Sequence, residues 1–328
     1  MTQTTGRGQK IFGLLIAAWL ALFAGAASAQ AYPNKPIRII VPTTPGGGID
    51  IGARLLAEKF KESMGQAVTV ENRAGGNSAI GTDAVAKAQA DGYTLLFASN
   101  AHVVLPLIAP KLPYDTNKDF IPVGSMAYLP YVLLVNSQLP VNSVKEFVAY
   151  AKARPGKLSF ASAGVGAGSH MAGEVFKAMT GVQMLHVPFK GGAPALVELA
   201  GGRVDALWST WNAAMALIKA GKIKALAVTS EKRYEGQPDV QTFAEAGMPD
   251  YQERAWLGLF APAGTPGPIV DKLNAEIAKV LQSPAIKEGF EAQGLLPLQT
   301  TRQQFADLLK RETATLAPIV KAENIRME

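Results

Sequence analysis

The sequence predicts an α/β protein in which strands alternate with helices and are arranged in two lobes. Short apolar runs alternate with helical patterns at regular spacing, as in the run 68–70, the pattern 80–90 and the run 93–98. Such alternation is typical of βαβ units and parallel sheets. The chain has 328 residues and no cysteine, so burial of apolar surface must stabilise it, and a chain of this length can form two lobes.

The first half of the chain is expected to start with a strand, a loop and a surface helix. The apolar run 37–41 leads into a glycine-rich loop at 45–48. Apolar residues then recur at helical spacing from Ile49 to Phe60, and Glu and Lys occupy the other side, which indicates a helix packed on a sheet. We expect strands at 37–41, 68–70 and 93–98, and helices at 49–64, 80–90 and 146–153.

The second half repeats this arrangement around a second glycine-rich loop. The strand expected at 157–160 leads into the loop 164–168. A stretch rich in proline and glycine, 261–268, breaks the pattern before two final helices, which no long strand separates. We expect further strands at 204–210 and 224–229, and helices at 170–180, 211–220, 269–282 and 302–322.

The order of these elements suggests that the chain crosses between the lobes twice. One economical arrangement places the crossings near 126–131 and 251–259, and two crossing segments would form a hinge. We therefore expect residues 30–128 together with 255–328 to form lobe I, and residues 129–254 to form lobe II.

The first 29 residues have the features of a secretory signal peptide. Arg7 and Lys10 precede the apolar run 11–24, and Ala27-Ser28-Ala29 provides a small-residue cleavage site. An uncleaved membrane anchor is the alternative, but the run is shorter than the roughly 20 residues that a membrane span needs. We expect the mature chain to begin near Gln30 and the product to be a soluble protein of a periplasm.

Charge and composition narrow the class of partner. The formal net charge is +6, and loss of Arg7 and Lys10 with the signal peptide lowers it by two. The remaining mild charge slightly favours acidic ligands. Basic residues are not clustered with aromatic ones, so we expect no nucleic-acid partner. The lack of cysteine excludes disulfides, thiolate metal sites and a lipidated cysteine, and we expect a monomer.

Catalytic and cofactor motifs are mostly missing. The sequence contains no G-x-S-x-G or G-x-x-x-x-G-K-[ST] motif, and the second loop lacks the downstream acidic residue of a dinucleotide site. The three histidines, His102, His170 and His186, do not have metal-ligand spacing. We expect no metal, no cofactor and no enzyme activity.

The two glycine loops are candidate anion-binding sites. Each lies between a strand and a helix, where the first helical amides have no internal partner and the helix dipole is positive. Thr43 and Thr44 in the first loop, and Ser162 and Ser169 in the second, add neutral hydrogen-bond donors. A tight turn without a ligand is the alternative for either loop alone. Two such loops suggest a small acid held between two lobes.

Four nearby side chains admit two interpretations each. His170, in the first turn after the second loop, could donate a hydrogen bond as a neutral imidazole or be structural. Asp50 could cap its helix, or it could orient a loop amide or a water. Trp208 and Trp211 could stack on a ligand, although tryptophans at a strand end more often pack in a core.

The chain closely resembles the Bug family, the substrate-binding proteins of tripartite tricarboxylate transporters. The resemblance covers nearly all of the mature chain. The matching stretches are YPNKPIR at 32–38, PGGGID at 45–50, AR at 53–54, ENR at 71–73, DGYTLL at 91–96, LPYD at 112–115, GVG at 164–166, HMAGE at 170–174, HVPFKG at 186–191, ALAVT at 225–229 and APAGTP at 261–266.

This resemblance implies a periplasmic-binding-protein fold of the type II kind, with a mixed, mainly parallel sheet flanked by helices in each lobe and two hinge crossings. It also implies closure on a small organic acid, transfer to the membrane permease subunits of the transporter, and no catalysis. The family often has an aromatic residue where Thr43 stands, so ligand identity does not transfer directly from relatives. The expected ligand-binding residues are Thr43, Thr44, Gly46, Gly47, Asp50, Ser99, Asn100, Ser162, Gly164, Val165, Gly166, Ser169, His170 and Trp208.

The leading hypothesis is therefore a periplasmic protein that binds a carboxylate. Two opposed loops suit two carboxylates, so a dicarboxylate is the preferred ligand. The tryptophans keep an aromatic, phthalate-type diacid as an alternative. A sensor that uses the same site, and a periplasmic enzyme on the same scaffold, are the other classes considered.

Overall fold

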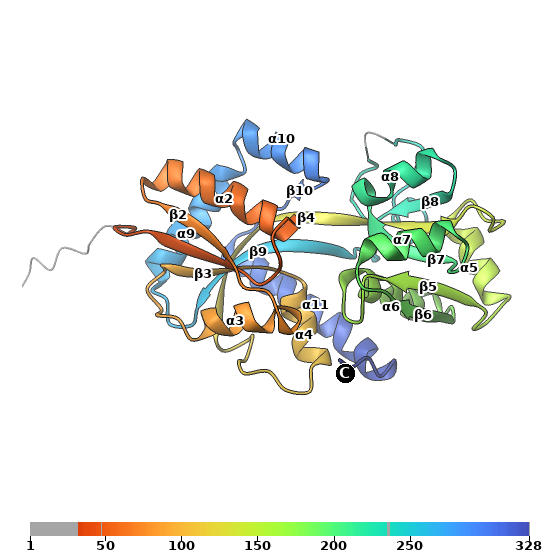
Figure 1. Ribbon diagram of the computed structural model, residues 1–328, viewed down its shortest axis with the longest axis horizontal. Helices are drawn as coiled ribbons and strands as arrows, with labels where there is room; N and C mark the ends of the chain where they lie inside the picture. The colour runs from red at the N-terminus through yellow and green to blue at the C-terminus, as the bar shows by residue number, and fades with distance from the viewer. Residues whose placement is uncertain (1–31, 47, 235–236, 328) are drawn as a thin grey trace, which may run out of the picture. The chain divides into compact units, whose positions relative to one another are not determined.

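A computed structural model describes residues 32–46, 48–234 and 237–327 of the chain (Figure 1). The expected signal peptide, 1–29, and the candidate ligand residue Gly47 lie outside the described residues. The chain divides into two compact units, residues 1–34 and 35–328. Only Tyr32–Asn34 is described in the first unit, so the elements below all belong to the second.

The first sheet combines parallel and antiparallel strands. The strand β1 pairs in parallel with β2 and β3, whereas β9 pairs antiparallel with β3 and β4, and β10 with β4. The strand order is β2-β1-β3-β9-β4. The bounds are β1 Ile37–Val41, β2 Val68–Asn72, β3 Thr94–Ser99, β4 Phe120–Asn136, β9 Arg254–Pro262 and β10 Leu296–Pro297.

The second sheet repeats this design. β5 pairs in parallel with β6 and β7, and β4 pairs antiparallel with β7 and β8. The bounds are β5 Leu158–Ser162, β6 Met184–Pro188, β7 Ala206–Thr210 and β8 Ile223–Val228. Mixed sheets in an α/β fold are confirmed, with the parallel pairing confined to three strands of each sheet.

The strand β4 belongs to both sheets. Residues up to Pro130 pair with β9, and those from Tyr131 onward pair with β7 and β8. A continuous strand of 17 residues differs from the short crossing segment expected near 126–131. The register between β4 and β9 shifts near Pro122 and again after Ser125, and bulges of this kind accommodate proline and glycine within a sheet. The lobe boundaries remain a prediction.

The helices flank these sheets. Most expected helices are present with small shifts at their ends. The helices α4, α7 and α10 are not among the expected ranges, and α3 ends earlier than expected, at Ala86. The bounds are α2 Gly48–Met64, the short 3-10 helix η1 Gly76–Ser78, α3 Ala79–Ala86, α4 Ala101–Ile108, α5 Val144–Lys152, α6 Gly168–Thr180, α7 Gly192–Ala200, α8 Trp211–Lys219, α9 Gly267–Val280, α10 Pro284–Gln293 and α11 Arg302–Ala322.

The helix α11 contributes to two hydrophobic cores. It begins with a capping box in which Thr301 and Gln304 satisfy each other's backbone amides. Near its start, Phe305 packs with Trp256 and Phe260 in one core of the first sheet. Near its end, Leu316 and Val320 lie in a core that contains β5, β7 and α6 of the second sheet. None of the helices in the described ranges is long and apolar enough to cross a membrane.

Candidate functional site

The first glycine loop, between β1 and α2, is organised by Asp50. This carboxylate is 3% exposed and accepts hydrogen bonds from the Gly46 amide at 2.9 Å, the Arg54 Nε at 3.0 Å and the Asn72 Nδ2 at 2.9 Å. Burial opposes ionisation of Asp50, but the bonds from Arg54, Gly46 and Asn72 hold its pKa below the usual value. Asp50 therefore orients a loop amide, which is one of the interpretations considered above.

The threonines of this loop differ in their surroundings. Thr44 is exposed. The Thr43 carbonyl accepts a hydrogen bond from Asn72 Nδ2 at 3.1 Å, while its Oγ1 is buried and has no hydrogen-bond partner among the described residues. A buried hydroxyl without a partner is costly. Thr43 is therefore the side chain of this loop that is best placed to gain from a ligand.

Ser99 is the last residue of β3, which lies next to β1 in the sheet, and Asn100 follows it; both are buried. Asn100 occupies the N-cap position of α4 but its side chain makes no capping bond. Its amide group lies beside Gly168, the first residue of α6: a Cβ at Gly168 would stand 3.2 Å from Asn100 Nδ2 and would clash with the Tyr131 hydroxyl. The end of β3 and the end of the second loop are therefore neighbours.

The second glycine loop, between β5 and α6, bonds mainly to its own side chains. Ser162 Oγ accepts from the Gly164 amide at 3.1 Å, Ser169 Oγ from the Ala163 amide at 3.0 Å, and His170 Nδ1 from the Gly166 amide at 3.1 Å. Gly164 and Gly166 have φ angles of 134° and 75°, values that favour glycine. Three amides of this loop are thus bonded to side chains within or directly beside the loop.

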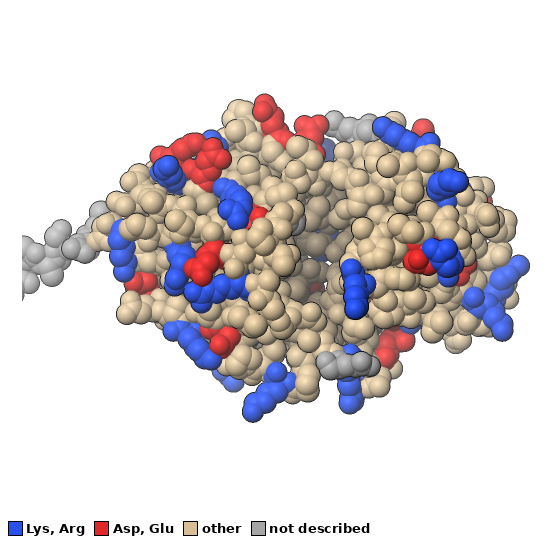
Figure 2. Space-filling view, viewed as in Figure 1, with Lys and Arg blue, Asp and Glu red and all other residues tan. Residues whose placement is uncertain are grey.

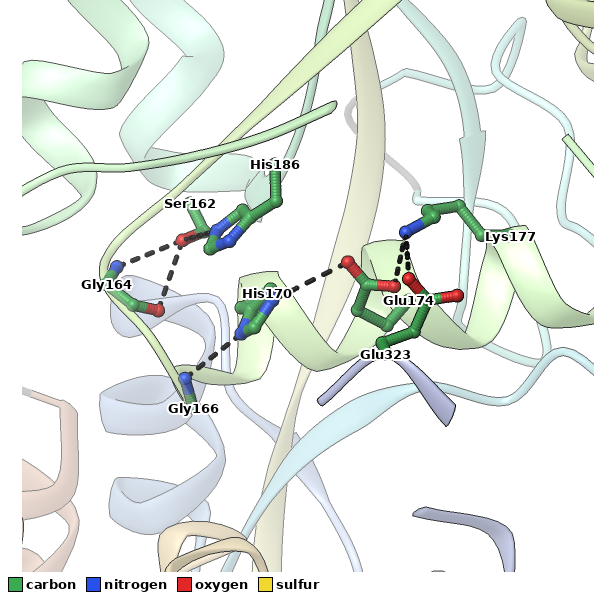
Figure 3. A network of polar contacts seen from close by, with 8 residues as sticks. All are labelled: Ser162, Gly164, Gly166, His170, Glu174, Lys177, His186 and Glu323. Atoms are coloured by element: carbon green, nitrogen blue, oxygen red, sulfur yellow. Dashed lines mark hydrogen bonds and ion pairs between the residues drawn. The ribbon is translucent and has the colours of Figure 1, made fainter. Parts of the chain in front are cut away.

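A polar network leads from this loop to α11 (Figure 3). Ser162 Oγ lies 2.6 Å from His186 Nε2, and the His186 ring stacks on His170 with centroids 3.7 Å apart. Burial lowers the pKa of His186 to about 3. Because His170 accepts at Nδ1, its proton is on Nε2, which faces Glu174 Oε1 at 3.6 Å.

The far half of the network consists of ion pairs. Lys177 Nζ lies 2.7 Å from Glu174 and 3.0 Å from Glu323, which follows α11. Burial acts to raise the pKa of Glu174, but hydrogen bonds from His170 and Lys177 hold it below the usual value. The side chains that shape the second loop are therefore connected to the end of α11.

Residues of the second loop line a large cavity. It has a volume of about 470 Å³, within the range of small-molecule sites. Its lining residues are Asn77, Ser78, Ala101, Val104, Leu105, Ile108, Ala163, Gly164, Val165, Gly166, Ala167, Arg326 and Met327. The wall thus joins η1 and α4 to the second loop and to the segment after α11. A smaller cavity beside it is lined in part by Pro42, Ser78 and Ser99.

The structure does not gather every predicted ligand residue at this cavity. Gly164, Val165 and Gly166 line it, and Asn100 adjoins it through Gly168. Thr43 and Gly46 are instead bonded to Asn72 and Asp50, and Thr44 is exposed. Ser162, Ser169 and His170 are buried, and their polar atoms serve the loop.

Trp208 is fully buried against Phe160 and Phe176, and Trp211 is 4% exposed. Their packing agrees with the core interpretation, since a large apolar ring at a strand end gains more from burial than from solvent contact.

Sequence reasoning missed part of the cavity wall and part of the loop support. Asn72 and Arg54 lie within matched family stretches, so their positions, though not their bonds to Asp50, were visible in the sequence. Arg326 and Met327 belong to no motif.

On the face shown in Figure 2, Lys and Arg are interspersed with Asp and Glu, and the surface is hollowed where elements of the two sheets meet.

The chain was compared with known proteins. The family described as tripartite tricarboxylate transporter family receptor matches residues 52–325. BugT of Bordetella pertussis is 39% identical over 320 residues, 97% of this chain and 98% of that protein.

Two solved structures from Rhodopseudomonas palustris are similar throughout. Rpa4515 with adipate has 36% identity and a TM-score of 0.74, covering 90% of this chain and 99% of that chain. MatC with bound malate has 33% identity and a TM-score of 0.71, covering 88% of this chain and 100% of that chain.

Proposed function

The chain belongs to the tripartite tricarboxylate transporter receptor family, and on that premise we propose that it captures a small dicarboxylate for delivery to a membrane permease. Members of this family are periplasmic binding proteins and not enzymes. The proposal includes export to the periplasm, removal of the signal peptide at 1–29, and a tripartite tricarboxylate-type permease as the partner.

The observation that carries the proposal is the composition of the cavity wall. The second glycine loop forms one side, and η1 and α4, which flank the first sheet, form another. Neither part encloses the cavity alone, so a ligand there would contact elements of both sheets. The loop and the starts of α4 and α6 would offer neutral donors and positive helix ends to a carboxylate.

An aliphatic diacid fits this site better than an aromatic one. The aromatic alternative rested on Trp208 and Trp211, and both side chains pack in cores. The cavity wall contains aliphatic side chains and no aromatic residue among those described. Adipate and malate, which are bound by two relatives, are both aliphatic dicarboxylates.

Isothermal titration calorimetry tests this proposal directly. The purified protein is titrated with malate, adipate, phthalate, citrate and hexanoate, each at matched pH and ionic strength. We expect saturable binding with one site per chain for at least one aliphatic dicarboxylate. Lack of measurable heat across the whole panel, with a folded protein by circular dichroism, would overturn the proposal.

A further inference from the structure

Arg326 is the one charged side chain among the described residues that line the large cavity. The other lining residues are small, aliphatic or neutral polar residues, or methionine. A cavity whose only charge is a cation attracts anions, and low-dielectric walls strengthen the attraction. The positive charge of Arg326 would attract the negative charge of an acid ligand.

The Arg326 side chain is exposed, and its guanidinium forms neither an ion pair nor a hydrogen bond with any other described residue. Several other arginines of the chain are paired, for example Arg302 with Asp271 and Arg54 with Asp50. A planar guanidinium matches a carboxylate with two parallel hydrogen bonds. Arg326 thus retains the bonding capacity that a carboxylate would use.

The segment that carries Arg326 is held in place on both sides. The Met327 amide donates to the Ile108 carbonyl of α4 at 3.0 Å, and Ile325 is buried in the core shared with α6. Glu323 is paired with Lys177 of α6. These contacts fix the backbone around Arg326, so less conformational entropy is lost when its side chain binds.

The wall beyond Arg326 is apolar. Val104, Leu105 and Ile108 of α4 face the cavity together with Val165 of the second loop. A hydrocarbon spacer would lie against these side chains, with one carboxylate near Arg326 and the other at the second loop. A monocarboxylate of the same length would satisfy only one end.

We propose that Arg326 binds one carboxylate of the ligand and thereby makes the site selective for diacids over monoacids. This inference rests on the proposed function, since it assigns a residue and a ligand class to the same site.

The test compares a diacid with a monoacid of equal carbon number on three variants. Calorimetry measures adipate and hexanoate binding to the wild type, to Arg326→Gln, to Arg326→Lys and to the control Arg311→Gln. Arg311 is an exposed arginine of α11 outside the cavity lining, so its replacement makes the same change in net charge. Circular dichroism and melting curves establish that each variant is folded.

We expect Arg326→Gln to weaken adipate binding by roughly 10- to 100-fold, the effect of losing a hydrogen bond to a charged group. Hexanoate affinity should change little, Arg326→Lys should lie between, and Arg311→Gln should match the wild type. Adipate binding by Arg326→Gln at wild-type affinity would overturn this inference while leaving the proposed function intact. Equal weakening of both acids would also overturn it, and if no acid binds the wild type, both proposals fall.

Discussion

The two glycine loops occupy equivalent places after β1 and β5, yet they are supported in opposite ways. A buried carboxylate supports the first loop: Asp50 holds the Gly46 amide and is itself held by Arg54 and Asn72. Neutral side chains support the second, where Ser162, Ser169 and His170 accept from its amides. Glycine spacing thus determines where such a loop occurs, whereas side chains outside the spacing determine which of its groups stay free for a ligand.

The largest effect is expected where the first loop's support is removed. Asp50→Ala leaves the Gly46 amide and Asn72 without their acceptor and Arg54 without its partner, so the free energy of unfolding should fall by about 3 kcal/mol. Urea denaturation followed by circular dichroism measures this. The control Arg54→Ala should cost less, because the Arg54 side chain is 52% exposed. Equal stability of Asp50→Ala and the wild type would show that the loop does not depend on this carboxylate.

The second loop should respond to pH in a different window. The folded state keeps His186 neutral, with a pKa of about 3 against an ordinary value of 6.5. Stability that is fully present above pH 6.5 is therefore lost as the pH falls toward 3, by about 1–2 kcal/mol on reaching pH 5. Asp50, whose pKa is lowered from 3.8, contributes a loss only below about pH 4.

Urea midpoints between pH 7.5 and 4.5 separate the two loops. His186→Gln should reduce the loss of stability between pH 6.5 and 5 to the part that comes from the buried His102, whose pKa is also lowered to about 3, while Asp50→Asn should leave the slope there unchanged. A His186→Gln profile parallel to that of the wild type would contradict the assignment of this slope to the second loop.

The smallest effect on stability is expected at Thr43. Thr43→Val keeps the side-chain shape and removes a buried hydroxyl that has no partner among the described residues, so stability should stay constant or rise by up to about 1 kcal/mol. Ligand affinity should fall if the hydroxyl contacts the acid, and calorimetry measures that. Thr44→Ala, at an exposed position, provides the control. A marked loss of stability in Thr43→Val would show that its hydroxyl already has a structural role.

Much of the fold could be predicted, because strand and helix periodicities are local. The strand β4 was the main exception: Pro122, Gly124 and Pro130 argue against a strand, and only pairing with β9, β7 and β8 compensates. A local sequence pattern does not show that pairing with distant strands compensates for such residues.

The candidate site was predictable to the same extent. The second loop lines the large cavity, and its role in binding stays a prediction. The role of Asp50 stayed open because Asn72, which fixes it, lies on the distant strand β2. Arg326 reaches the cavity only because α11 packs across both sheets. A residue whose position depends on long-range packing leaves no motif in the sequence.

The packing of α11 also bears on how the molecule would lose its structure. Phe305 completes a core of the first sheet, and Leu316 and Val320 complete a core of the second. Neither core is whole without this helix, so its detachment would expose apolar surface in both at once. The final helix therefore couples the unfolding of the two sheets. A partially unfolded chain with one sheet intact would be a high-energy species.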